Sequence, residues 1–349
     1  MSYRIPRGVR RVAFLLGLLA VSSAPAVAAG SVNVYSYRQP QLIQPMLDAF
    51  TKKTGIEVKV LHASKGLEEK IAAEGANSPA DLLFTVDIGR LSAAKNKGIT
   101  APFHDKFIEE NVPAQYRDPD GHWIGLTTRS RVVLASKERV KQDSISYEEL
   151  ADPKWKGKIC IRSGQNDYNV ALIASMIAHH GEAKTEEWLK GVKENLARKP
   201  AGNDRVQAKG VYTGECDLAI TNTYYMALMM TNEKEPEQKK WAESVKLIFP
   251  NQGDRGAHMN ISGMSLIKTA PNKENAIKLM EFLASAEGQA LYAQANNEFP
   301  VKEGVQSGPI AASWGKFKAD DVSIAKIGEL RKKASELVDK VGFDAGPST

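Results

Sequence analysis

Residues 32–84 read VNVYSYRQPQLIQPMLDAFTKKTGIEVKVLHASKGLEEKIAAEGANSPADLLF. Short runs of β-favouring residues alternate here with stretches that have helical periodicity. The β-like runs are Val32–Tyr35, Glu57–Leu61 and Asp81–Phe84, and the helical patterns are Gln41–Thr54 and Gly66–Glu74. A repeated strand–helix unit predicts an α/β fold, an open sheet with helices on both faces.

The amino terminus has the pattern of a secretory signal peptide. Four arginines and no acid precede an apolar run, Val12–Val21, and small residues that end at Ala28. The run is too short to span a membrane, so we expect cleavage near Ala28 and a mature protein that is not membrane-embedded. Arg10-Arg11 raises twin-arginine export, but Phe14 falls one place late for that pattern, and Sec export is the default.

The charge of the chain owes much to this leader. The 349 residues include 47 basic and 41 acidic side chains, a net charge of +6. Removing the four leader arginines leaves 43 basic residues and a net charge of +2. With no basic run interleaved with aromatics, we expect neither nucleic acid nor a membrane surface as a partner.

The remaining chain is too long for one core. About 320 residues suit two lobes, and two long β-like stretches, Leu126–Ser136 and Met259–Ile267, are suited to cross between them. We expect the signal peptide at residues 1–28. The first lobe would comprise 29–127 plus 252–302, and the second 128–251 plus 303–349.

Cys160 and Cys216 are the two cysteines. An even count in an exported chain favours a disulfide, which would stabilise the fold by about 3 to 4 kcal/mol. The alternative, a two-thiol metal site, has no nearby His to complete a tetrahedron.

Three tyrosines occupy similar settings at predicted helix starts. Tyr224 and Tyr225 follow Thr221-Asn222-Thr223, and Tyr168 follows Gly164-Gln165-Asn166-Asp167. An Asn, Asp or Thr cap would place each ring in the first turn of a helix that follows a strand, facing the crevice of the sheet. Clustered phenolates are hard oxygen ligands suited to Fe³⁺, and three would match its charge. The alternative is that these rings are ordinary core or interface aromatics.

Other sequence motifs are less informative about function. Asp204-Arg205 resembles a turn with a charge pair, with support of the cleft as an alternative. The chain has no Gly-x-Ser-x-Gly elbow, no phosphate-binding loop and no His-Glu-x-x-His pair, so an enzyme is not expected.

Several phrases resemble the bacterial periplasmic ferric-ion-binding proteins over essentially the whole mature chain. They are Val32–Gln39, Ser78–Leu83, Leu150–Lys158 and Gly214–Asp217, together with the tyrosine pair and the upstream tyrosine. The resemblance implies a two-lobed periplasmic binding protein of type II, with two hinge strands and the ligand in the cleft. It also implies a periplasmic location, a monomer and an inner-membrane ABC permease as partner.

The first lobe departs from the pattern of many relatives. Where they supply a His this chain has Arg38-Gln39-Pro40, and where some carry a Glu it has Val86. The resemblance is therefore to the subgroup in which the second lobe provides the protein ligands, Tyr168, Tyr224 and Tyr225, and a carbonate-like anion completes the shell. Arg38 is the expected anion partner, because a guanidinium binds carbonate through two parallel bonds. Gln39 and Arg129 are further candidates, and a surface charge is the alternative for Arg38.

These observations predict an iron(III)-binding protein that closes at its hinge around iron and anion. The alternative function is binding of an organic or oxyanion solute, such as a polyamine, thiamine or a sugar phosphate, on the same scaffold. A third class is an anion-dependent hydrolase. Visible absorption separates the first two, because Fe³⁺ phenolates are coloured.

Overall fold

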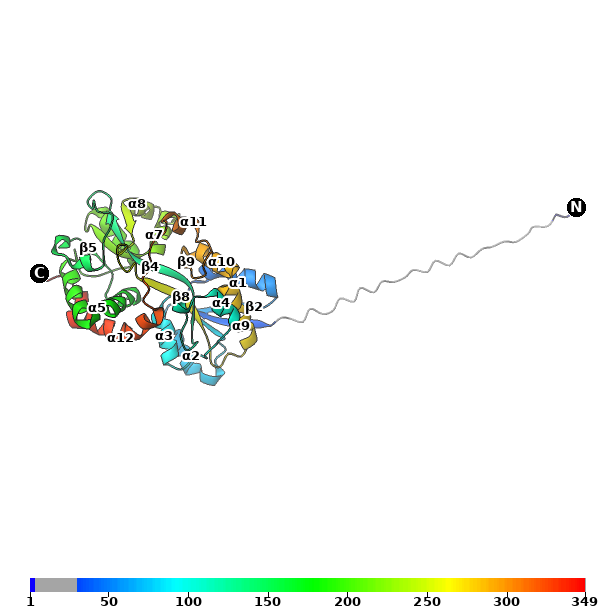
Figure 1. The fold of residues 1–349 in the computed structure, drawn as a ribbon. Coiled ribbons are helices and arrows are strands. Elements are labelled where there is room, and N and C mark those ends of the chain that lie inside the picture. The colour runs from blue at the N-terminus through cyan, green and yellow to red at the C-terminus, as the bar shows by residue number, and fades with distance from the viewer. Residues whose placement is uncertain (4–29, 349) are drawn as a thin grey trace.

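The computed structural model describes residues 1–3 and 30–348 (Figure 1). Beyond its first three residues, the expected signal peptide lies outside the described part of the chain. Within the described part, no helix combines the length and apolar character that a membrane span requires.

A nine-stranded mixed sheet organises the described residues. Its main path has the order β2-β1-β3-β8-β4-β6-β5, and β7 and β9 also pair with β4. The strands are β1 Ser31–Ser36, β2 Glu57–His62, β3 Leu82–Thr85, β4 Ile124–Ser136, β5 Ile159–Cys160, β6 Leu218–Asn222, β7 Val245–Ile248, β8 Met259–Leu266 and β9 Phe299–Pro300. The parallel pairs β1–β2, β1–β3 and β5–β6 confirm the α/β class.

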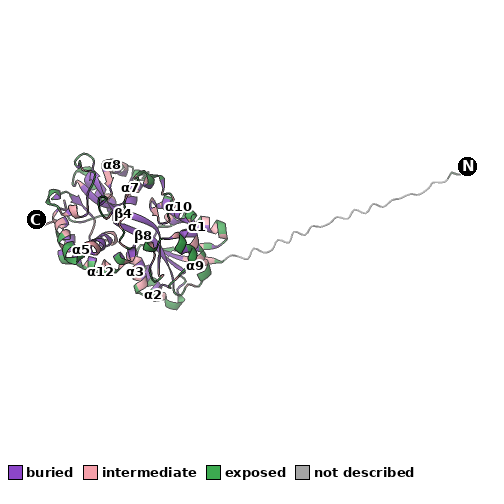
Figure 2. Ribbon diagram, viewed as in Figure 1, coloured by how far each residue is buried: buried purple, intermediate pink, exposed green. Residues whose placement is uncertain are grey.

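Two long strands join the two halves of the sheet. The first part of β4, Ile124–Ser130, pairs with β8, and Arg131–Ala135 pairs with β6. Every residue of β4 and β8 is buried, and Figure 2 shows both strands in purple across the middle of the molecule. β4 changes partners between Ser130 and Arg131.

Helices cover the sheet on each side (Figure 1). They are α1 Pro40–Thr54, α2 Leu67–Glu74, α3 Ile88–Asn96, α4 Lys106–Asn111, α5 Asp167–Glu194, α6 Asp204–Thr213, α7 Thr223–Met230, α8 Glu237–Glu243, α9 Lys273–Ala284, α10 Ala286–Asn296, α11 Pro309–Ser313 and α12 Ile324–Val341. One apolar cluster unites β1 and β3 with α1 and α9, and another unites α5 with α12. The second cluster also includes Ile88 and Leu91 of α3, so it extends from the second half of the molecule to the first.

One local expectation was wrong. Asp204-Arg205 begins α6 instead of forming a turn, because the Asn203 side chain accepts hydrogen bonds from the Arg205 and Val206 amides and caps the helix.

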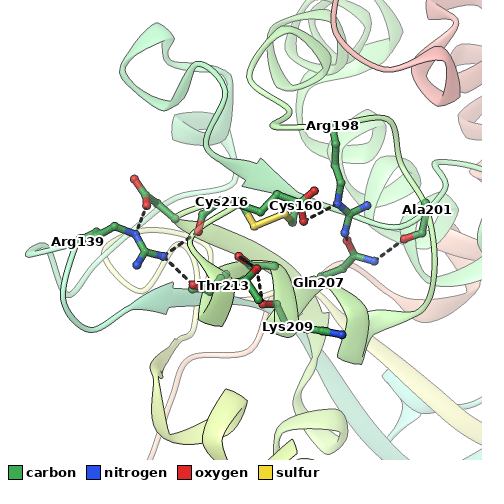
Figure 3. Close-up of a disulfide and its surroundings, with 12 residues drawn as sticks. Arg139, Cys160, Arg198, Ala201, Gln207, Lys209, Thr213 and Cys216 are labelled. Carbon is green, nitrogen blue, oxygen red and sulfur yellow. Dashed lines mark hydrogen bonds and ion pairs between the residues drawn. A yellow bond between two sulfur atoms is a disulfide. The ribbon is translucent and has the colours of Figure 1, made fainter. Parts of the chain in front are cut away.

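The disulfide prediction is confirmed, and the two-thiol metal site is wrong. Cys160 ends β5 and Cys216 precedes β6, and their Cα atoms lie 5.9 Å apart. Figure 3 shows the bridge beside α6 and its flanking arginines, Arg139 and Arg198. A Cβ at Gly210 would lie 2.8 Å from the Cys160 sulfur, so glycine is required for α6 to pack this closely.

Candidate metal-binding site

The first turns of α5 and α7 position the three candidate tyrosines. Asn166 caps α5 and accepts a hydrogen bond from the Tyr168 amide, so Tyr168 is the second residue of that helix. Asn222 occupies the cap position of α7, which places Tyr224 and Tyr225 second and third. The expected strand–cap–tyrosine arrangement is therefore present in both places.

The three rings share one environment. The Tyr224 and Tyr225 ring centroids lie 4.4 Å apart. Guanidinium groups surround the rings: Arg162 lies 5.3 Å from the Tyr168 centroid and Arg205 lies 5.6 Å from that of Tyr225. Positive charge around the phenols favours their anionic form once it is created.

Residues from both halves of the molecule line a pocket of about 160 Å³. Its lining from the first half is Arg38, Gln39, Leu42 and Asn296, and its lining from the second half is Tyr168, Arg205, Tyr224, Tyr225 and Leu228. Five of the six residues predicted as metal or anion ligands thus line one small cleft.

Arg129, the sixth, is absent from the pocket lining and belongs to a buried cluster. Its Cζ lies 5.9 Å from the Tyr224 ring centroid, and its Nη2 donates to Ser262 at 2.7 Å and to Glu298 at 3.2 Å. Arg38 Nη2 contacts the same two residues, at 2.6 Å and 2.7 Å. Two guanidinium groups therefore share one carboxylate that is fully shielded from solvent.

This arrangement changes two expectations for Arg38, those of a surface charge and of a free anion partner. Arg38 is buried, so the surface-charge alternative is wrong. Its Nε donates to the Tyr292 hydroxyl at 3.1 Å, so Nε and Nη2 on one edge of the guanidinium already have protein acceptors. An anion bound through that edge would have to share these donors.

Two of the three phenols, those of Tyr168 and Tyr224, have a raised pKa. Burial, with the neighbouring Tyr225 oxygen as a second cause, raises the pKa of Tyr168 to about 12. Burial and the Tyr168 oxygen likewise raise the pKa of Tyr224 well above its ordinary value. Although burial opposes ionisation of Glu298, the charges of Arg129 and Arg38 outweigh it and lower the pKa of Glu298. The site thus places two phenols of raised pKa near a buried arginine–glutamate cluster in which the pKa of Glu298 is lowered.

Sequence reasoning missed several residues of this region. Asn296, Leu42 and Leu228 line the pocket, and Glu298 lies in the buried cluster that contacts Arg38. None of the four carries a local motif, and tertiary packing brings them to this region. In the described residues, no group of three His, Cys, Asp or Glu side chains is placed to hold a metal. The tyrosine signal was therefore the informative one for a metal hypothesis.

Comparison with known proteins identifies the family. The family model described as bacterial extracellular solute-binding protein matches residues 77–319. The chain belongs to this family.

Relatives in the family agree with the resemblance drawn from the sequence. Iron uptake protein A1 of Synechocystis is 46% identical over 314 residues, which cover 89% of this chain and 87% of the relative. The ferric iron-binding protein A of Mannheimia haemolytica, solved in an open conformation, superimposes with a TM-score of 0.87 at 48% identity and covers 90% of this chain and 99% of its own.

The Trichodesmium protein IdiA (FutA), solved with iron and citrate ligands, also gives a TM-score of 0.87, at 44% identity. That alignment covers 90% of this chain and 100% of the relative. The predicted resemblance to periplasmic ferric-ion-binding proteins is confirmed, as is the two-lobed type II binding-protein fold. The solute-binding family is one of transport proteins.

Proposed function

We propose that this protein binds iron(III) in the periplasm and delivers it to an inner-membrane ABC permease. Tyr168, Tyr224 and Tyr225 would ligate the metal as phenolates, and a carbonate-like anion would complete the shell. The lobes would be residues 29–127 plus 252–302 and residues 128–251 plus 303–349, hinged at β4 and β8. The mature, monomeric protein would begin after cleavage near Ala28.

One observation carries the proposal: three tyrosines from two helix starts converge on a single small pocket. Three hard anionic oxygens suit Fe³⁺ in charge and in ligand type. The named relatives that are iron uptake or ferric-binding proteins support the same cargo.

The anion has its own support. Arg129 Nε and Nη1 are buried and have no hydrogen-bond partner within the described residues. A buried donor without a partner is costly, so an anion that accepted hydrogen bonds from these two nitrogens would stabilise the site. Arg38 and Gln39 line the pocket directly and would contact the anion from the first lobe.

An optical titration tests this proposal. Metal-stripped protein would be titrated with ferric nitrilotriacetate with and without bicarbonate, while the visible range is scanned for a phenolate-to-iron charge-transfer band. We expect a band that saturates at one iron per chain and strengthens with bicarbonate. In Arg38→Gln we expect a smaller bicarbonate effect, because one charged anion partner is lost.

The alternative solute class is tested by the same experiment. Leu42 and Leu228 give the pocket apolar walls, which an organic ligand could contact. Absence of any visible band in the wild-type protein would reject the tyrosinate site and favour an organic or oxyanion solute, with Tyr224 and Tyr225 stacking on it.

A further inference from the structure

Arg131 lies in β4 where that strand leaves β8 and begins to pair with β6, directly opposite Asn222 in the register. Its side chain is buried, with 1% of its surface exposed. The residue therefore sits between the hinge strands and the cap of α7.

The guanidinium of Arg131 reaches the first turns of both tyrosine-bearing helices. Its Nε and Nη2 donate to Asn169 Oδ1 at 3.1 Å and 2.8 Å, and Asn169 directly follows Tyr168. Its Nη1 donates at 3.1 Å to Asn222 Oδ1, and the Asn222 amide in turn lies 3.4 Å from the Tyr224 hydroxyl. One planar group thus joins the helix starts that carry Tyr168 and Tyr224.

A buried carboxylate holds that group in place. Arg131 Nη1 also donates to Asp204 Oδ1 at 2.5 Å, and Arg162 donates to Asp204 Oδ2 at 2.8 Å. The Asn169 amide donates to the Arg162 and Ser163 carbonyls, so the loop before Tyr168 is tied to the same network. A fully buried carboxylate between two guanidinium groups has few alternative arrangements, so Asp204 holds the guanidinium of Arg131 in one orientation.

The backbone of Arg131 is tied to the other hinge strand. Its amide donates to the His258 carbonyl, and its carbonyl accepts from the Tyr147 hydroxyl, which also accepts from the His258 amide. Movement of β4 relative to the start of β8 would therefore be transmitted to the side chain of Arg131.

We propose that Arg131 is a positioning residue for iron binding: its planar guanidinium sets the separation between Tyr168 and the Tyr224–Tyr225 pair. This inference rests on the tyrosinate site proposed above. A lysine would keep the charge but could not donate in the same plane to Asn169, Asn222 and Asp204. The role therefore belongs to the geometry of the guanidinium and not to its charge.

The test compares Arg131→Lys with Arg139→Lys, using ferric nitrilotriacetate as the iron source and the visible band as readout. Arg139 is an ion-paired arginine of the same lobe that bonds to Asp217. Figure 3 shows it near the disulfide. Loss of an outer-shell partner typically costs about 10- to 100-fold in metal affinity, and we expect this for Arg131→Lys, with a shifted band. Arg139→Lys should change affinity by less than about twofold, as for a surface ion pair.

A double-mutant cycle separates positioning from general loss of structure. In a Tyr168→Phe background the separation of Tyr168 from the pair no longer matters, so Arg131→Lys should cost less than about threefold. An equal cost in both backgrounds, or an unchanged affinity and band in folded Arg131→Lys, would overturn the inference.

A second variant covers failure of Arg131→Lys to fold. Asn222→Ser keeps a residue that is favoured at the cap position but removes the amide that links Arg131 to Tyr224. It should weaken iron binding at least threefold with a shifted band. Unchanged binding in Asn222→Ser would also overturn the inference. Absence of a band in the wild-type protein would instead reject the proposed function.

Discussion

The two sides of the cleft use the same buried unit in different ways. On one side Arg38 and Arg129 share Glu298, and on the other Arg131 and Arg162 share Asp204. In the Asp204 cluster, Arg131 donates to Asn169 and Asn222 at the helix starts that carry the tyrosines. In the Glu298 cluster, two nitrogens of Arg129 have no hydrogen-bond partner within the described residues. In the proposed function, the Asp204 cluster would hold the tyrosine ligands in place and the Glu298 cluster would receive the anion.

The largest effect should come from removing ligands on the second-lobe side. Loss of one partner of a buried ionic contact costs about 3 to 5 kcal/mol, so the loss of two in Tyr224→Phe with Tyr225→Phe should weaken iron binding by at least about 10⁴-fold. Competition with nitrilotriacetate measures the loss, and circular dichroism should show an intact fold. Retention of near wild-type affinity by this double variant would remove the tyrosines from the site.

The second prediction concerns pH and follows from the raised phenol pKa values. Tyr168, with a pKa raised to about 12, and Tyr224 are protonated near neutral pH in the metal-free site and must lose their protons to ligate iron. Binding therefore releases at least two protons and weakens as pH falls, by up to about 100-fold per pH unit for two protons.

Proton release can be measured directly by adding ferric chelate to weakly buffered protein and following pH, with the chelate alone as the blank. The Tyr224→Phe, Tyr225→Phe variant should release fewer protons. Iron binding whose affinity does not change between pH 8 and pH 6 would contradict phenolate ligation.

A third prediction sharpens the comparison of the two carboxylates. Asp204→Asn should reduce iron affinity about tenfold or more even without bicarbonate, because it loosens the support of the tyrosines. Glu298→Gln should lower only the bicarbonate-dependent part of the iron affinity, because it disturbs Arg38 and Arg129. Titrations of both variants with and without bicarbonate test this difference, and identical profiles would show that the two clusters share one role.

The smallest effect on iron should come from the disulfide. Cys160→Ser with Cys216→Ser opens a bridge between residues 56 positions apart and should lower the free energy of unfolding by about 3 to 4 kcal/mol. Iron affinity in the folded double variant should change less than about threefold, because the sulfurs contact α6 at Gly210 and not the tyrosines. Chemical denaturation and the optical titration measure the two quantities on the same samples.

The sequence predicted those features that local patterns encode. Strand–helix alternation predicted the α/β class, and a cap residue followed by tyrosine predicted the positions of Tyr168, Tyr224 and Tyr225 at helix starts. The disulfide followed from compartment and cysteine count. In each case neighbouring residues, or the composition of the chain, carried the signal.

The supporting clusters left no such signal. Arg38 and Glu298 are 260 positions apart, and Arg131 lies 91 positions from Asn222. A buried ion pair depends on which strands become neighbours, and a single sequence does not reveal that. The helix at Asp204 was missed for a related reason, because its Asn203 cap stands in a polar stretch typical of turns.

Resonance Raman spectroscopy of the iron-loaded protein is the most direct test of the central claim. With excitation in the visible band, the account predicts enhanced ring vibrations of iron-bound phenolate that are lost in the Tyr224→Phe, Tyr225→Phe variant. One iron bound per chain without any phenolate vibrations would contradict the tyrosinate site.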